Sequence, residues 1–314
     1  MQNLIAFAGQ IEETEKCHWI SRLSKKIPLA DIIAVEDLTV DQRDLVEIAI
    51  VANPDPETLS VLPNLKWVHS VWAGVERMIE QLADQNLMIT RLKDPELART
   101  MAEASLAWTL YIHRNMPEYA KQQRAKKWKE LPYRKASQVT VGILGLGSLG
   151  ARSAEVLRVN GFSVHGWSRT EKQLEGIRCL SGDSGLSNLL CSSDILIVLL
   201  PLTNETRGLL GARLLKSMKK GASVINFARG PIVDVAILED LLDTGHLSHA
   251  VLDVFDEEPL DPSSTLWSHP DITILPHISA PTDMETASEI VGANVMRFLE
   301  TGELPEIVDT SRGY

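Results

Sequence analysis

Cysteine is scarce in this chain of 314 residues, which contains only three. Cys17, Cys179 and Cys191 lack the close spacing of metal ligands, so no metal site is expected, and free thiols in a reducing cytoplasm are favoured over disulfides. Long apolar runs are also missing, because no stretch approaches the ~20 uninterrupted apolar residues of a membrane span. The first ten residues lack the basic and apolar regions of a signal peptide. A cytoplasmic protein with no membrane partner is therefore predicted.

Net positive charge is absent as well. The 31 Lys and Arg residues are outnumbered by 42 Asp and Glu residues, which gives a formal net charge of −11 and argues against a nucleic-acid partner. One basic cluster stands out, and we interpret it as the solvated face of a helix. It consists of Lys121, Arg124, Lys126, Lys127 and Lys129. A bound anion would depend on individual arginines and backbone amides.

The order of short apolar runs predicts the fold. Runs typical of strands alternate with stretches of helical spacing, which predicts an α/β fold of two domains with parallel sheets. Strands are expected at residues 3–8, 31–35, 48–52, 65–70, 86–92, 139–144, 162–167, 194–200, 222–228, 249–254 and 271–275. Helices are expected at 14–27, at 101–129 with a kink or break at Pro117, at 233–243 and at 284–299, among others. Because ligands gather at the carboxyl ends of parallel strands, the loops at those ends are the candidates for function.

The most informative motif follows the expected strand at 139–144, where the chain reads G-L-G-S-L-G and then becomes helical. In this context Gly145 would make a tight turn, Gly147 would let a pyrophosphate approach the backbone, and Gly150 would let the helix pack closely. Backbone amides at the positive end of the helix dipole would face the anion, and they include those of Ser148 and Leu149. We interpret the segment as a dinucleotide-binding loop, with an ordinary glycine-rich turn as the alternative.

A carboxylate is absent where NAD-specific folds place one, roughly 20 positions after the glycines. The stretch there contains Ser168, Arg169 and Thr170. A carboxylate would repel a 2′-phosphate, whereas the planar guanidinium of Arg169 and the two hydroxyls can donate to it. NADP(H) is therefore expected in preference to NAD(H). An arginine that merely lies on the surface is the alternative.

Three polar side chains follow expected strands in the second half of the chain: Arg229, Glu258 and His277. Each has an ordinary explanation by itself, as a loop residue or part of a turn. In the first half, a possible anion-binding turn of backbone amides follows the strand at 65–70, with a plain strand-to-helix turn as the alternative. It consists of Ala73, Gly74 and Val75.

Together these residues resemble the D-2-hydroxyacid dehydrogenase family. Its signatures are the glycine loop, a strand end of a small residue followed by Arg-Gly, the pattern D-V-F-x-x-E-P and the pattern P-H-x-x. The last three occur here at 228–230, 253–259 and 276–279, so the resemblance spans nearly the whole chain. W-S-R-T at 167–170, L-D-V-F at 252–255 and the ending Arg312-Gly313-Tyr314 are similar to the branch that reduces glyoxylate and hydroxypyruvate.

The resemblance implies a mechanism in which a hydride passes from the nicotinamide to the carbonyl carbon of a 2-oxoacid. His277 would give the proton to the carbonyl oxygen, and Glu258 would accept the other ring N–H. Arg229 would polarise the keto oxygen and pair with the substrate carboxylate. The amides of Ala73, Gly74 and Val75 would bind the same carboxylate, and Trp128 would reach the site of a partner subunit.

The same resemblance implies further cofactor contacts, with Asp253 binding the nicotinamide amide. The others are Pro201, Thr206, Phe227, Ala228 and Ala280. It also implies a Rossmann cofactor domain, residues 102–284, inserted into a flavodoxin-like substrate domain of residues 1–101 and 285–314. The length and composition of the segment at 101–129 suit either an inter-domain crossover or a dimer-forming arm, and a homodimer is predicted from it.

Two departures leave the substrate open. Ala104 stands where many family members have a histidine after Ala-Glu, and Ile278 to Pro281 replace the usual small residues and threonine. One alternative is a reductase of bulkier 2-oxoacids, with Trp72, Met101 and Trp128 shaping the pocket. Another is a non-catalytic regulator that senses the dinucleotide.

Overall fold

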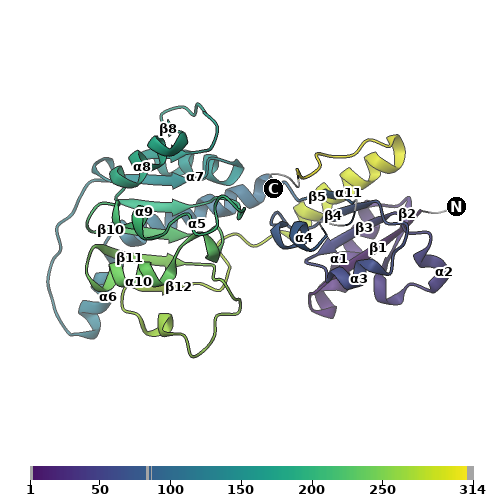
Figure 1. Ribbon diagram of the computed structural model, residues 1–314, viewed down its shortest axis with the longest axis horizontal. Helices are drawn as coiled ribbons and strands as arrows, with labels where there is room; N and C mark the ends of the chain where they lie inside the picture. The colour runs from purple at the N-terminus through teal and green to yellow at the C-terminus, as the bar shows by residue number, and fades with distance from the viewer. Residues whose placement is uncertain (1–2, 83–84, 86, 310–314) are drawn as a thin grey trace. The chain divides into compact units, whose positions relative to one another are not determined.

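The computed structural model describes residues 3–82, 85 and 87–309 of the chain. Contacts divide the chain into two units, residues 1–96 with 282–314 and residues 97–281. Each unit is built on one parallel sheet, which confirms the expected α/β fold with two sheets (Figure 1). The ending Arg312-Gly313-Tyr314, which the resemblance used, lies outside the described residues.

The first unit contains a five-stranded sheet in the order β2-β1-β3-β4-β5. Its strands are β1 (Asn3–Gly9), β2 (Ala30–Ala34), β3 (Ile48–Ala52), β4 (Trp67–Ser70) and β5 (Met88–Thr90). Its helices are α1 (Glu13–Lys26), α2 (Val40–Arg43), α3 (Pro56–Ser60), α4 (Glu76–Gln81) and α11 (Met284–Thr301). This strand order is that of flavodoxin-like folds.

Alternating side chains of β1 give this sheet two buried faces. Ile5 and Phe7 pack in one core cluster with Trp19 of α1 and with residues of α11. Ala6 and Ala8 belong to a second cluster, which contains residues of α3 and α4. The sheet is therefore covered by helices on both faces, as near-continuous apolar strands require.

The second unit contains a seven-stranded sheet in the order β12-β11-β10-β9-β6-β7-β8. Its strands are β6 (Thr140–Leu144), β7 (Ser163–Trp167), β8 (Arg178–Leu180), β9 (Ile195–Val198), β10 (Ala222–Asn226), β11 (Leu247–Leu252) and β12 (Ile272–Ile274). Its helices are α6 (Met116–Arg124), α7 (Ser148–Val159), α8 (Gly182–Ser192), α9 (Ala212–Lys216) and α10 (Val235–Asp243), and α5 (Pro95–His113) enters from the first unit. The strand order reverses between β6 and β9, which is the position where Rossmann folds bind dinucleotides.

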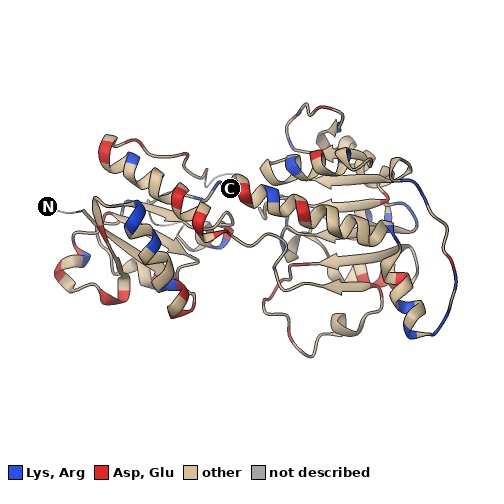
Figure 2. Ribbon diagram, turned by 180° about the vertical axis from the view of Figure 1, so that it is seen from behind, with Lys and Arg blue, Asp and Glu red and all other residues tan. Residues whose placement is uncertain are grey.

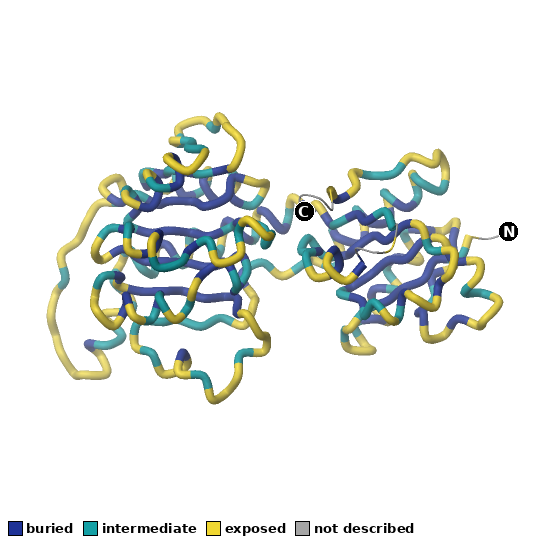
Figure 3. The backbone as a smooth tube through the Cα atoms, viewed as in Figure 1, coloured by how far each residue is buried: buried dark blue, intermediate teal, exposed yellow. Residues whose placement is uncertain are grey.

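The structure differs from the sequence-based expectation in the long helical segment. The chain forms two helices, α5 and α6, separated at Asn115, whose φ is +56°, and Pro117 lies in the first turn of α6. Helix α6 ends at Arg124, and Lys126 has a φ of +54°, so the expected helix over 125–129 is wrong. Residues 125–130 are exposed and irregular instead (Figure 3).

The basic cluster is consequently not one helical face. Lys121 and Arg124 lie on α6, and Lys121 forms an ion pair with Asp271, whereas the remaining lysines lie on the exposed segment after the helix (Figure 2).

Strand β8 is a further difference, because no strand was expected at its position. Within the described ranges, no helix has the length and apolarity to cross a membrane.

A buried histidine of the first unit leads to a prediction about stability. His69 on β4 is 0% exposed, its Nδ1 lies 2.9 Å from the carbonyl oxygen of Ser70, and its Nε2 lies 3.0 Å from Asn294 Nδ2. Because the amide of Asn294 can only donate through Nδ2, the ring is neutral with its proton on Nδ1. Burial lowers the pKa of His69 to about 4.

We expect acid to destabilise the first unit through this group. The unfolded chain takes up the proton at a pKa of about 6.5, so the contribution of His69 is intact above that pH and is lost as the pH falls toward 4. The loss corresponds to about 3 kcal/mol, since each pKa unit is worth about 1.4 kcal/mol. Urea unfolding curves recorded at several pH values between 8 and 4 measure this loss of stability. His69→Gln should be less stable at pH 8 but lose less stability in acid, and parallel curves for the two proteins would contradict this account.

Candidate active site

The glycine loop after β6 has the geometry that its sequence predicts. Gly145 has a φ of +112°, and a Cβ there would lie 2.7 Å from the carbonyl oxygen of Leu199. A Cβ at Gly150 would lie 1.8 Å from the carbonyl oxygen of Gly145, so only glycine lets α7 pack this closely on the loop. At Gly147, in contrast, no atom lies within 4 Å of the Cβ position. This leaves space at the N-terminus of α7, where Ser148 and Leu149 begin the helix.

The loop after β7 contains two cations, one of which contacts this motif. Arg169 Nη1 lies 3.2 Å from Glu205 Oε2, and both side chains are largely exposed. Lys172 Nζ donates to the carbonyl oxygen of Leu146 over 2.6 Å, inside the glycine loop. Ser168 is buried and its hydroxyl donates to the carbonyl oxygen of Thr170 over 2.8 Å, so this hydroxyl shapes the loop.

The stretch after β9 forms a compact turn. Thr206 Oγ1 donates to the carbonyl oxygen of Pro201 over 2.7 Å and accepts the amide of Thr203 over 2.8 Å. Pro201 and Thr206, expected together near a cofactor, therefore belong to one hydrogen-bonded unit at the carboxyl edge of the sheet.

Arg229 is held by the last residue of β10. Asn226 is 1% exposed, its Nδ2 donates to the carbonyl oxygen of Arg229 over 3.0 Å, and its Oδ1 accepts the amide of Ala228 over 3.1 Å. Phe227 and Ala228 are buried between them. Arg229 Nη1 donates to the carbonyl oxygen of Ala228 over 2.6 Å, which orients the guanidinium.

His277 and Glu258 form a hydrogen-bonded pair. Nδ1 of His277 lies 2.8 Å from Oε2 of Glu258, and Oε1 of Glu258 accepts the amide of Phe255 over 2.9 Å. A carboxylate can only accept, so the ring proton at this contact is on Nδ1 and Nε2 is the nitrogen left for chemistry. His277 itself has a φ of +52°, an uncommon conformation for a residue with a side chain.

The charges around this pair tune both groups. The hydrogen bond to Glu258 raises the pKa of His277 against an opposing effect of burial, and the charge of Arg229 also lowers it. Burial raises the pKa of Glu258, but the bonds from His277 and from the amide of Phe255, with the charge of Arg229, bring it below its ordinary value. Arg229, Glu258 and His277 are thus within electrostatic range of one another, at the ends of three neighbouring strands.

Asp253 holds the loop that carries His277. Its Oδ1 accepts the amide of Ile278 over 2.8 Å, its Oδ2 accepts the amide of Ser279 over 3.0 Å, and its carbonyl oxygen accepts the amide of His277 over 2.9 Å. Asp253 is 2% exposed. The buried hydroxyl of Ser279 has no partner among the described residues, and Ala280, half-buried, follows it. Binding of the nicotinamide amide by Asp253 stays a prediction.

Several positioning residues were not predicted from the sequence. A Cβ at Gly230 would lie 2.1 Å from the carbonyl carbon of Phe255, so this glycine lets the loop of Arg229 pack against the loop of Glu258. Asn226 and Lys172 are the other two. Only Gly230 had a sequence signal, as part of the Arg-Gly pattern.

Two further predictions concern other segments of the chain. Ala73, Gly74 and Val75 belong to the first unit, after β4, and precede α4. The amide of Trp72 donates to Ser70 Oγ over 3.0 Å, which fixes the start of the turn. Trp128 is 99% exposed on the segment after α6, so its side chain is not packed among the described residues.

Comparison with known proteins agrees with the geometry. The family model of the D-isomer specific 2-hydroxyacid dehydrogenase NAD binding domain matches residues 106–279. Two curated relatives, both named glyoxylate/hydroxypyruvate reductase A, come from Serratia proteamaculans (35% identity, 94% of this chain and 96% of the relative) and Yersinia enterocolitica (36% identity, 96% and 97%).

Solved structures give the same assignment. A D-isomer specific 2-hydroxyacid dehydrogenase from Xanthobacter autotrophicus Py2 in complex with NADPH and MES is 36% identical, with a TM-score of 0.91 over 100% of both chains. An NADPH-dependent glyoxylate/hydroxypyruvate reductase from Sinorhizobium meliloti, in complex with NADP and sulfate, is 31% identical, with a TM-score of 0.90 over 99% of this chain and 100% of that one. The chain belongs to the D-isomer specific 2-hydroxyacid dehydrogenase family of oxidoreductases.

Proposed function

We propose that this protein reduces a small 2-oxoacid, glyoxylate or hydroxypyruvate, with NADPH as the reductant. The observation that carries the proposal is the 2.8 Å hydrogen bond between His277 Nδ1 and Glu258 Oε2, close to the charge of Arg229. The names of the two curated relatives support the substrates. The NADPH and NADP of the two structural relatives support the cofactor.

The residues divide the chemistry between them. The nicotinamide, when bound, supplies the hydride. His277, protonated and held through Nδ1, gives its Nε2 proton to the oxygen that develops negative charge. Glu258 fixes the ring and stabilises its charged form. Arg229 pairs with the substrate carboxylate and polarises the keto oxygen, a task that its planar donor fork suits better than an ammonium group does.

The residues present fit a dinucleotide. The space in front of Gly147 lets a pyrophosphate reach the start of α7, where free amides and the helix dipole favour an anion. Pro201, Thr206, Phe227, Ala228, Asp253 and Ala280 are proposed to line the rest of the cofactor site. The substrate carboxylate is proposed to bind the amides of residues 73–75 as well.

Preference for NADPH over NADH is proposed to depend on two cations. Arg169 and Lys172 lie on one loop, and the 2.6 Å contact of Lys172 with Leu146 keeps its ammonium group beside the glycine loop. Both can donate to a 2′-phosphate, and no carboxylate occupies positions 168–170 to repel one.

Initial rates test the proposal. NADPH oxidation should be rapid with glyoxylate and hydroxypyruvate, slower with NADH, and slower with phenylpyruvate. Faster turnover of phenylpyruvate would favour the bulkier substrate class. Binding of NADPH without oxidation with any of these 2-oxoacids would point to a dinucleotide sensor and refute the proposed reaction.

Glu205 gives a sharper test of cofactor selectivity. Its carboxylate lies 3.2 Å from Arg169, so it would repel a 2′-phosphate that binds this guanidinium. Across water a charge contact of this kind is worth about 1 kcal/mol, so Glu205→Gln should tighten NADPH binding about fivefold and leave NADH binding unchanged. Quenching of tryptophan fluorescence measures both dissociation constants. Glu103→Gln, which removes the acid of another exposed arginine pair (Arg99, 2.9 Å), is the matched control. Equal tightening of NADH would refute this role.

We also propose a homodimer that uses the segment after α6. Trp128, which the family resemblance assigns to the site of a partner subunit, is 99% exposed, so its large apolar ring is available for contact with a second copy. Sedimentation should show a dimer whose dissociation constant rises in Trp128→Ser. A monomer at all concentrations would refute the proposal.

A further inference from the structure

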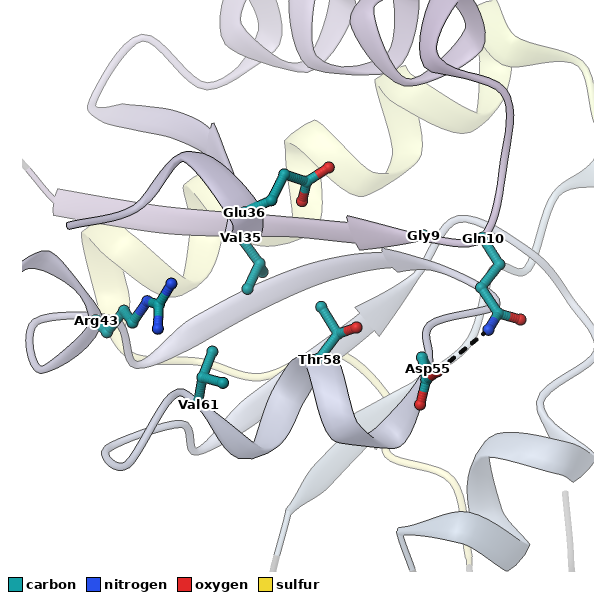
Figure 4. Close-up of a pocket in the computed structure, with 8 residues that line it drawn as sticks. All are labelled: Gly9, Gln10, Val35, Glu36, Arg43, Asp55, Thr58 and Val61. Carbon is teal, nitrogen blue, oxygen red and sulfur yellow. Dashed lines mark hydrogen bonds between the residues drawn. The ribbon is translucent and has the colours of Figure 1, made fainter. Parts of the chain in front are cut away.

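The first unit contains a pocket that the proposed reaction does not use. Its volume is about 330 Å³, which is within the usual range for small-molecule sites. It is lined by Gly9, Gln10, Val35, Glu36, Arg43, Asp55, Thr58 and Val61 (Figure 4). None of residues 73–75, the proposed substrate turn, is among them.

The position of the pocket in the sheet is that of a ligand site. Gly9 ends β1, Val35 and Glu36 follow β2, and Asp55 follows β3. In the order β2-β1-β3-β4-β5, strand β2 lies on one side of β1, and strands β3, β4 and β5 lie on the other. The strand order therefore reverses between β1 and β3, and the carboxyl ends of these two strands flank the switch point. Open α/β sheets bind ligands in the crevice at this point.

Arg43 gives one end of the pocket a positive charge. Arg43 Nε is buried and has no hydrogen-bond partner within the part of the chain that the structure describes. No ion pair of Arg43 is found there either. Thr58 lies on α3 between Arg43 and Asp55 (Figure 4). The guanidinium of Arg43 suits a carboxylate, which can accept more than one hydrogen bond from it.

The opposite end contains the carboxylate of Asp55 and the amide of Gln10, across the pocket from Arg43 (Figure 4). Arg77 Nη2 also donates to Gln10 Oε1 over 3.4 Å. Gln10 Nε2 lies 3.5 Å from Asp55 Oδ2, a weak contact, so the carboxylate keeps capacity to accept further bonds. Glu36 forms an ion pair with Lys16, which also pairs with Glu13, so one ammonium group faces two carboxylates. Two carboxylates in the lining disfavour a dianion such as phosphate.

We propose that this pocket is a second ligand site, and that it binds a small zwitterion with a carboxylate at Arg43 and an ammonium group at Asp55. Val35 and Val61 line the space between the two ends and contact the aliphatic part of the ligand. The site belongs to the first unit alone and does not depend on the proposed reaction. An amino acid whose carboxylate and ammonium group lie at opposite ends of its chain is the ligand class that this arrangement recognises.

Calorimetry with straight-chain ω-amino acids tests the proposal on the whole protein. Glycine, 4-aminobutanoate and 6-aminohexanoate serve as probes of increasing length, and hexanoate and hexylamine carry only one of the two charges. At least one amino acid should bind in the millimolar range, up to ~10 mM, and tenfold more tightly than either singly charged control. If no amino acid binds, or if hexanoate binds equally well, the proposal is wrong.

Three variants locate the binding. Arg43→Gln and Asp55→Asn should each weaken it at least tenfold, and asparagine keeps the cap that Asp55 provides to the amide of Glu57. Arg297→Gln, an exposed arginine of α11, is the control and should change nothing. Thermal unfolding without ligand checks that the variants fold. Binding that survives Arg43→Gln, or that glyoxylate displaces, would place the ligand elsewhere and overturn the assignment. His277→Ala should bind the zwitterion normally, whether or not the proposed reaction is correct.

Discussion

His277→Ala is expected to lower kcat for glyoxylate reduction by about 10²–10⁴-fold, the usual contribution of a positioned general acid. The imidazole is the one titratable group of the cluster whose pKa is suited to exchanging a proton near neutral pH. Its Nδ1 is fixed by Glu258 over 2.8 Å, so the variant loses the proton donor without disturbing the glycine loop. Stopped-flow and steady-state NADPH oxidation measure the loss, and the dissociation constant of NADPH should stay within a factor of about two.

Glu258→Gln is the matched variant that separates charge from position. Glutamine can still accept the Nδ1 proton through its amide oxygen, but it removes the negative charge that raises the pKa of His277. Because reduction needs the protonated ring, kcat/KM falls as the pH rises through this pKa. The falling limb should therefore lie at lower pH in Glu258→Gln than in the wild-type protein. A His277→Ala protein with full activity, or a limb that does not move in Glu258→Gln, would show that the proton comes from another group.

The parts of the site that the sequence predicted depend on local signals. The glycine motif spans only six residues, 145–150. Arg229, Glu258 and His277 each come shortly after an apolar run that is typical of a strand. In a parallel sheet, all strand ends of one kind meet at one edge, so the position of each residue in its own loop was enough to bring the three together. Long-range contacts did not have to be known.

The supporting contacts could not be predicted in the same way. Gly230 and Lys172 act on loops that are distant in sequence, so their geometry depends on how those loops pack. Asn226 acts on its own loop, three residues before Arg229. Strand β8 has three residues and lies at the edge of its sheet, where the apolar signal is weak. The end of α6 at Arg124 was missed because alanine and lysines follow it, which are good helix formers with no stop signal.

Arg229→Lys is expected to lower kcat/KM by about 10²–10³-fold, the range found when a donor to a developing oxyanion is removed. Lysine keeps the positive charge but not the planar fork, which can bond a carboxylate and a keto oxygen together. It also cannot reproduce the 2.6 Å bond from Nη1 to the carbonyl oxygen of Ala228 that orients the side chain.

The pH profile of the Arg229 variants distinguishes the two contributions. The charge of Arg229 lowers the pKa of His277, so Arg229→Met should move the falling limb of kcat/KM to higher pH, whereas Arg229→Lys should leave it near its wild-type position. Arg207→Lys, on the turn after β9, is the control and should retain activity. If Arg229→Lys were fully active, a point charge would suffice, and the assignment of bidentate substrate binding to Arg229 would be wrong. If both variants lost activity with no movement of the limb in Arg229→Met, the guanidinium would act on the substrate alone and not on the proton donor.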